Sequence, residues 1–134
     1  MTALTDAQAA FLRDNPFVGV VTDLRADGSA HSTVVWVDVD EGGVSINTAR
    51  GRVKTRNIAR DPRVSLIVVD PGNAFRWVAI SGSATLVDDG AEAQIDRLAT
   101  KYLGHDAYQW RRPGERRVTV RIAPERVEAV GLDG

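Results

Sequence analysis

The chain has 134 residues, a formal net charge of -1 and no cysteine. This length suits one domain, so we expect a single unit over residues 1–134. The absence of cysteine excludes a disulfide scaffold and a thiolate metal site, and His31 and His105 lack metal-ligand spacing. The near-zero charge gives no electrostatic case for nucleic acid. Because the sequence shows neither a bilayer-length apolar run nor a secretion signal, we expect a cytoplasmic protein without a membrane span.

The first half of the chain predicts one short helix and three strands. Thr5 followed by Gln8 forms a capping box, and the helix that it opens ends at Asn15-Pro16. Apolar, β-branched runs and turn residues then predict three antiparallel strands in meander order. The strands are expected at residues 17–22, 30–40 and 44–47, with turns at 25–28 and 40–43.

The second half predicts strands at residues 63–69, 75–87, 116–122 and 126–130 and a helix at 90–102. The strand at 63–69 is apolar in its second half, so we expect burial on both faces. Gly82 predicts a bulge or a close contact, Asp88 is the expected helix cap, and Pro124 separates the last two strands. The strand at 116–122 alternates in polarity, which predicts a half-exposed strand.

These elements together predict a mainly β fold, a closed or half-closed β-barrel with short helices added. Exposed strand edges and a modest core favour a homodimer.

The segment at residues 47–57 is strongly basic, and no acidic residue lies between Glu41 and Asp61. Its cations are Arg50, Arg52, Lys54 and Arg56. The pattern is that of a strand, a small loop and a short helix, and a helix dipole disfavours cations in the first turn. Free N–H groups there favour phosphate, while Thr48 adds a hydroxyl and Gly51 permits close backbone approach. The segment therefore predicts a phosphate anchor, with a solvated basic helix face as the alternative.

No catalytic side chain is predicted, because the sequence has no nucleophile–base set and no Gly-rich nucleotide motif. Anchoring groups beside apolar walls suit a protein that holds a phosphorylated cofactor, which then performs the chemistry. Two readings stay open for Trp36, core packing or a cofactor wall, and two for Arg76, an exposed cation or a ligand contact. The aromatic and basic loop at 108–112 could cover a site, contact a second subunit or stack on bases.

Two stretches resemble a known family. Asn47-Thr48 followed by Lys54, with Asn57-Ile58 and then the run from Asp61-Pro62 to Leu66, is similar to the flavin-phosphate segment of the pyridoxamine 5'-phosphate oxidase-like split β-barrels. The strand from Arg76-Trp77 to Ala84 is similar to the next landmark of that family. The short chain, the strand at 34–37 and the Arg- and Lys-rich sequence at 50–57 resemble the branch of this family that uses the deazaflavin coenzyme F-420, often called FDOR-B. The resemblance covers residues 4 to about 131.

This resemblance implies an FMN-binding-like split β-barrel homodimer with a cofactor in each of two grooves between the subunits. It implies an F-420-dependent reductase that transfers hydride to an unsaturated small molecule, such as an enone, a quinone or a tetrapyrrole. An FMN-binding oxidoreductase and a non-catalytic protein for the cofactor or a haem-type ligand are the alternatives. The residues that it places at the cofactor are Val34, Val35, Trp36, Val37, Asn47, Thr48, Arg50, Arg52, Lys54, Arg56, Asn57, Arg76 and Trp77.

The resemblance also implies individual roles. Thr48 and Lys54 match phosphate-binding positions, and Asn47 matches the neighbour of the ring or ribityl chain. The strand at 34–37 matches the one whose backbone contacts the ring, and Arg76 meets the cofactor from the fifth strand. The remaining arginines of the basic segment would add charge for the phosphate or for the polyglutamate tail of F-420.

One departure from the family pattern concerns the residue before Lys54. The flavin-phosphate oxidases typically have an arginine there, and this chain has Val53, for which Arg52 is a possible substitute. The C-terminal Trp and Arg that bind pyridoxal phosphate in those oxidases have no secure match. Both departures weigh against a true pyridoxamine phosphate oxidase and against FMN.

Overall fold

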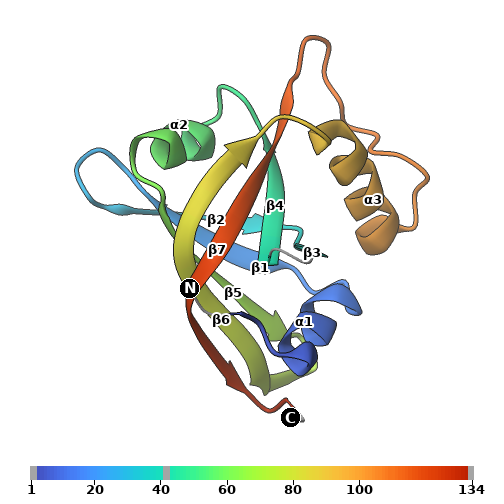
Figure 1. Ribbon diagram of the computed structural model, residues 1–134. Helices are drawn as coiled ribbons and strands as arrows, with labels where there is room; N and C mark the ends of the chain where they lie inside the picture. Colours follow the sequence, from blue (N-terminus) through green and yellow to red (C-terminus); the bar gives the residue numbers. More distant parts are fainter. Residues whose placement is uncertain (1–2, 41–42, 133–134) are drawn as a thin grey trace.

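One antiparallel sheet of seven strands dominates the computed structural model, which describes residues 3–40 and 43–132. The strand order is β2-β1-β5-β6-β7-β4-β3, and three helices accompany the sheet (Figure 1). In chain order the elements are α1 (Asp6–Arg13), β1 (Gly19–Leu24), β2 (Ala30–Val35), β3 (Asp38–Asp40), β4 (Gly43–Ala49), α2 (Val53–Arg60), β5 (Arg63–Asp70), β6 (Asn73–Val87), α3 (Ala91–Leu103) and β7 (Arg117–Val130). The prediction of a mainly β fold with short helices is confirmed. The turn predicted at 40–43 falls partly outside the described residues.

The sheet closes on itself because β2 and β3 occupy its opposite edges, although just two residues, Trp36 and Val37, separate them in the chain. An extended residue spans at most about 3.6 Å, so the two edges must approach each other and the sheet curls into a barrel. The predicted unbroken strand at 30–40 is therefore wrong, since it is divided into β2 and β3. The consecutive antiparallel pairing of the predicted meander is confirmed, because β1 pairs with β2 and β3 pairs with β4. The backbone of Val37 bonds to α3 instead of continuing a strand, since its N–H donates to Tyr102 Oη at 3.0 Å and its carbonyl accepts from Lys101 Nζ at 2.8 Å.

The longest strand pair, β6 with β7, carries the bulge that Gly82 predicted. The register shifts between Ser81 and Gly82, and a Cβ on Gly82 would lie 2.0 Å from the carbonyl oxygen of Ala123. The irregular pairing accommodates Pro124, which has no N–H to donate. Pro124 therefore lies inside one continuous strand of 14 residues, and the prediction of two strands separated at Pro124 is wrong.

Helix α1 contributes to the core as its sequence predicted. Its capping box is confirmed, since Gln8 N–H donates to Thr5 Oγ1 at 3.1 Å and Thr5 N–H donates to Gln8 Oε1 at 2.9 Å. Phe11 and Leu12 are 2 % exposed and pack into the core of the barrel. Other core side chains come from the strands, from α2 and from the link between β2 and β3, among them Val21, Val37, Ile46, Ile58, Leu66, Val78, Ile80 and Ile122.

Part of one face of the sheet is apolar and exposed, which contradicts the predicted burial of the strand at 63–69 on both faces. Val64, Leu66 and Val68 of β5 are buried, whereas Ile67 is 39 % exposed. Val20 pairs with both Ile67 and Val34 across neighbouring strands, and Val34 is 66 % exposed. An exposed apolar row, formed by Val34, Val20 and Ile67, therefore crosses β2, β1 and β5. Within the described ranges, no helix is long and apolar enough to cross a membrane.

Candidate functional site

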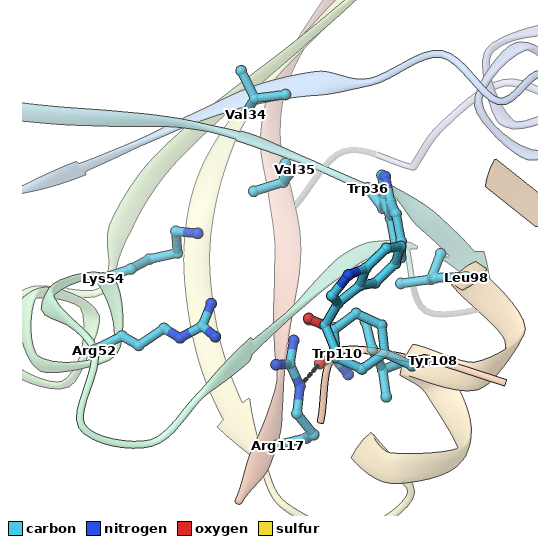
Figure 2. Close-up of a pocket in the computed structure, with 11 residues that line it drawn as sticks. Val34, Val35, Trp36, Arg52, Lys54, Leu98, Tyr108, Trp110 and Arg117 are labelled. Carbon is cyan, nitrogen blue, oxygen red and sulfur yellow. Dashed lines mark hydrogen bonds between the residues drawn. The ribbon is translucent and has the colours of Figure 1, made fainter. Parts of the chain in front are cut away.

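A cavity of about 250 Å³ lies between the end of β2, the start of α2, helix α3 and the loop before β7. Figure 2 shows Arg52 and Lys54 on one side of it and Trp36, Tyr108 and Trp110 on the other, with Arg117 close to the aromatic side chains. Its lining residues are Val34, Val35, Trp36, Asn47, Arg52, Lys54, Ile95, Leu98, Tyr108, Trp110 and Arg117. The fold thus brings together predicted cofactor residues from β2, β4 and the start of α2.

Helix α2 begins at the cavity without a side-chain cap. Arg52 is its N-cap residue in extended conformation and makes no side-chain capping hydrogen bond within the described part of the chain, and the first turn has no acidic residue. The N–H groups at this end of the helix therefore remain available to an anion. Lys54 follows in the first turn and lines the cavity.

The Lys54 ammonium has no hydrogen bond or ion pair within the parts of the chain that the structure describes. Burial lowers the pKa of Lys54, and the charges of Arg52 and Arg117 lower it further, while Asp23 opposes this effect. A buried charge without a partner is unfavourable, so an anionic ligand in this cavity would gain a charge-assisted hydrogen bond from Lys54.

Arg117 is a third cation at the cavity that sequence reasoning missed. Its side chain is 3 % exposed, its Nε donates to Asn47 Oδ1 at 2.8 Å, and its guanidinium contacts the Glu115 carboxylate and lies 5.1 Å from the centre of the Tyr108 ring. The polar alternation of β7 indicated an exposed position, which is wrong for Arg117 and for Thr119, 7 % exposed. The register that pairs Arg117 with Ala49 places it behind the basic segment, and this pairing has no local signal in the sequence.

Asn47 lines the cavity, but its amide is already engaged. Its Nδ2 donates to the carbonyl of Ala91 at 2.8 Å and to Gln94 Oε1 at 2.9 Å, while its Oδ1 accepts from Arg117. Gln94 is 4 % exposed and was also missed; its Nε2 donates to Ser45 Oγ at 2.9 Å and to a carboxylate of β3. In this arrangement Asn47 orients the Arg117 guanidinium, and Gln94 orients Asn47.

The aromatic side of the cavity is a contiguous set of rings. Trp36 stacks on Tyr102 with a centroid distance of 5.4 Å and meets Tyr108 edge-on at 6.3 Å. Tyr108 contacts Trp110 at 5.7 Å, and Trp110 is 54 % exposed. Arg111 fixes this loop by bonding to carboxylates of α3 at 2.9 and 3.0 Å. Of the two readings of Trp36, the structure favours a cavity wall, since the indole is half-buried and lines the cavity.

Other residues of the basic segment lie away from this cavity. Arg50 forms a double hydrogen bond to Asp88 at 3.0 and 2.9 Å. Asp88 is therefore not the cap of α3, whose N-cap is Gly90. Arg56 donates to the carbonyl of Gly51 at 2.8 Å, and the hydroxyl of Thr48, a residue 1 % exposed, is buried without a hydrogen-bond partner among the described residues.

The remaining predicted cofactor residues do not line the cavity. Val37 is fully buried, and Asn57, 5 % exposed, donates to the buried Asp23 carboxylate at 2.7 Å. Arg76 pairs with Asp70 at 3.0 Å, and Trp77 pairs with strand neighbours on β5 and β7. Cofactor contacts of these residues, and of Thr48, Arg50 and Arg56, stay predictions. The described residues contain no group of three or more side chains suited to hold a metal ion.

Comparison with known proteins identifies the class that this fold and cavity define. The model of the pyridoxamine 5'-phosphate oxidase family matches residues 4–131, so the chain belongs to that family. A solved F420 reductase is 25% identical over 89% of this chain and 94% of its own, with a TM-score of 0.76. The conserved hypothetical protein Rv2991 of Mycobacterium tuberculosis is 25% identical over 96% of this chain and 85% of its own, also with a TM-score of 0.76.

A third structural neighbour is HutZ, the heme storage protein of Vibrio cholerae, which is 16% identical over 98% of this chain and 97% of its own, with a TM-score of 0.68. At that identity the likeness concerns the fold. These comparisons confirm the predicted family and the split β-barrel fold.

Proposed function

We propose that this protein is a reductase that uses coenzyme F-420 and passes hydride to an unsaturated small molecule. The observation that carries the proposal is the cavity itself, where the half-buried Lys54, which has no hydrogen bond or ion pair among the described residues, lies opposite an aromatic wall. The structural similarity to an F420 reductase over nearly the whole chain supports the same cofactor.

The residues at the cavity fit the two chemically different ends of this cofactor. Lys54, Arg52, Arg117 and the uncapped start of α2 offer donors for a phosphate group. Val34, Val35 and Trp36 offer an apolar and aromatic surface for a flat ring. When bound, the reduced deazaflavin supplies the hydride. The protein's part is to orient the ring and to exclude water, which agrees with the absence of a predicted catalytic side chain.

We propose that a second copy of the chain completes the site. A cavity of about 250 Å³ is small, because sites for cofactor-sized ligands occupy roughly 300–1,000 Å³. Val34 belongs both to the cavity lining and to the exposed apolar row with Val20 and Ile67. A subunit that packs on this row would bury exposed apolar surface and also add a wall to the cavity. This arrangement gives a homodimer with two equivalent cofactor grooves.

Fluorescence titration with F-420 tests the anchor. Lys54→Met removes the charge-assisted contact, which is worth about 1.5–3 kcal/mol, so the Kd should rise roughly 10- to 150-fold. The matched control is Arg60→Met on the same helix, since Arg60 bonds to the carbonyl of Leu24 and to Asn57 outside the cavity. Equal effects of the two substitutions would contradict the assignment of Lys54.

The cofactor and the reaction need a separate experiment. The protein is expressed in a host that makes both FMN and F-420, and the absorbance of the purified protein is recorded. A tightly bound flavin spectrum would replace the deazaflavin proposal with an FMN-binding oxidoreductase. Reduced F-420 is then assayed with enones, quinones and biliverdin-like tetrapyrroles; binding without oxidation of the cofactor by any of them would favour a non-catalytic binding protein.

A further inference from the structure

A buried carboxylate, Glu115, contacts the two arginines that line the cavity. Its side chain is 8 % exposed, and its Oε1 lies 3.4 Å from Arg52 Nη2 and also accepts a hydrogen bond from Arg117 Nη1. Its Oε2 accepts the backbone N–H of Arg112 at 2.9 Å. Glu115 does not line the cavity, but it contacts both arginines that do.

Glu115 carries its charge at neutral pH. Burial raises the pKa of this carboxyl, but the Arg112 N–H, the hydrogen bond from Arg117 and the charges of Arg117 and Arg52 outweigh burial and hold the pKa below its usual value. The carboxylate of Asp23, which is fully buried, also acts on Lys54 through its charge. Asp23, Glu115 and Glu92, whose carboxylate accepts the backbone N–H of Arg117 at 2.9 Å and also binds Arg111, therefore offset much of the positive charge of Arg52, Lys54 and Arg117.

This balance matters because phosphate groups differ in charge. A phosphate monoester, such as the one in FMN, carries about −1.5 to −2 at neutral pH, since its second pKa is about 6. A phosphodiester, such as the one in F-420, carries one negative charge. We propose that Glu115 makes this anion site selective for a singly charged phosphodiester, because its fixed carboxylate repels the second charge of a monoester. The proposal rests on the proposed function, namely that these three cations hold the cofactor phosphate.

Two ligands that differ by one charge test the selectivity directly. They are the deazaflavin riboside 5'-phosphate and its phosphate methyl ester, which share the ring and the ribityl chain. We expect the full-length protein at pH 8 to bind the methyl ester roughly tenfold more tightly than the monoester. Glu115→Gln keeps the shape and a hydrogen-bond acceptor for the arginines, and it should abolish the preference mainly by tightening the monoester. Asp88→Asn, which removes a carboxylate paired with Arg50 outside the cavity, should leave the preference unchanged.

A measurement on the unmodified protein keeps the test decisive if Glu115→Gln fails to fold. The ratio of the two Kd values should approach one as the pH falls from 8 to 5, because the monoester becomes singly charged below a pH of about 6. A ratio that does not change with pH, a preference for the monoester, or an unchanged preference in Glu115→Gln would each overturn the role of Glu115. If neither phosphorylated compound binds more tightly than the unphosphorylated riboside, the phosphate anchor itself is wrong.

Discussion

Replacing Gln94 by Met tests the buried hydrogen-bond network behind the cavity. The Gln94 amide makes four hydrogen bonds, with Asp38, Ser45, Asn47 and Thr119, at distances of 2.9 to 3.1 Å. Met has a similar shape but forms none of them. Of the four partners, Asp38 is affected least by the lost hydrogen bond, because its carboxylate keeps the contact with Arg97 at 3.0 Å.

The magnitude follows from the three other partners. Ser45 and Thr119 are 1 % and 7 % exposed, so their hydroxyls have little access to water as a replacement, and Asn47 keeps one of its two N–H contacts. A net hydrogen bond is worth about 1 kcal/mol, so Gln94→Met should lower the free energy of unfolding by about 3 kcal/mol. With a urea m-value of about 2 kcal/mol/M, the unfolding midpoint should fall by roughly 1.5 M.

Urea unfolding followed by tryptophan fluorescence measures this change. The matched control is Gln109→Met, since Gln109 is exposed in the loop before β7 and should change stability by less than about 0.5 kcal/mol. F-420 affinity provides a second readout, because a loosened Asn47 no longer orients Arg117. The reasoning is refuted if Gln94→Met and Gln109→Met shift the midpoint equally.

Three further predictions concern the bulge, acid stability and the exposed row. Gly82→Ala should destabilise the fold by about 3 kcal/mol in the same urea assay, because the new Cβ would lie 2.0 Å from the carbonyl oxygen of Ala123. Arg63 lowers the pKa of Asp61 from 3.8 to about 2, so the stabilisation from this pair is complete above pH 4 and is lost as the pH falls towards 2. The difference in unfolding free energy between the parent protein and Asp61→Asn should therefore shrink as the pH falls from 4 to 2. A difference that stays constant over this interval would contradict the assignment of the pair. Ile67→Asp should convert the proposed dimer to a monomer in sedimentation equilibrium, and an unchanged mass would rule out this face as the interface.

Part of the candidate site could be found from the sequence, because two of its cations are neighbours in the chain. Arg52 and Lys54 share one basic segment at a helix start, and both line the cavity. Thr48 belongs to the same segment, but its hydroxyl is buried and lies away from the cavity lining. A sequence pattern gives the positions of polar residues along a strand; it does not give the side of the barrel on which each one ends.

The sequence by itself determined the local elements. Capping at Thr5, the bulge at Gly82 and the short helix that begins in the basic segment each depend on residues that are close together in the chain. Such features follow from backbone geometry and from side chains a few positions apart, so a linear pattern is sufficient to predict them.

The tertiary structure alone decided which strand edges meet and which charges share the cavity. The pairing of β4 with β7 brings Arg117 and Glu115 to the basic segment. The two-residue link of Trp36 and Val37 between the edge strands β2 and β3 closes the barrel. The same curvature leaves the row of Val34, Val20 and Ile67 exposed. These outcomes depend on pairing between distant segments, because register and burial are set by the partner strand, whose position no local pattern encodes.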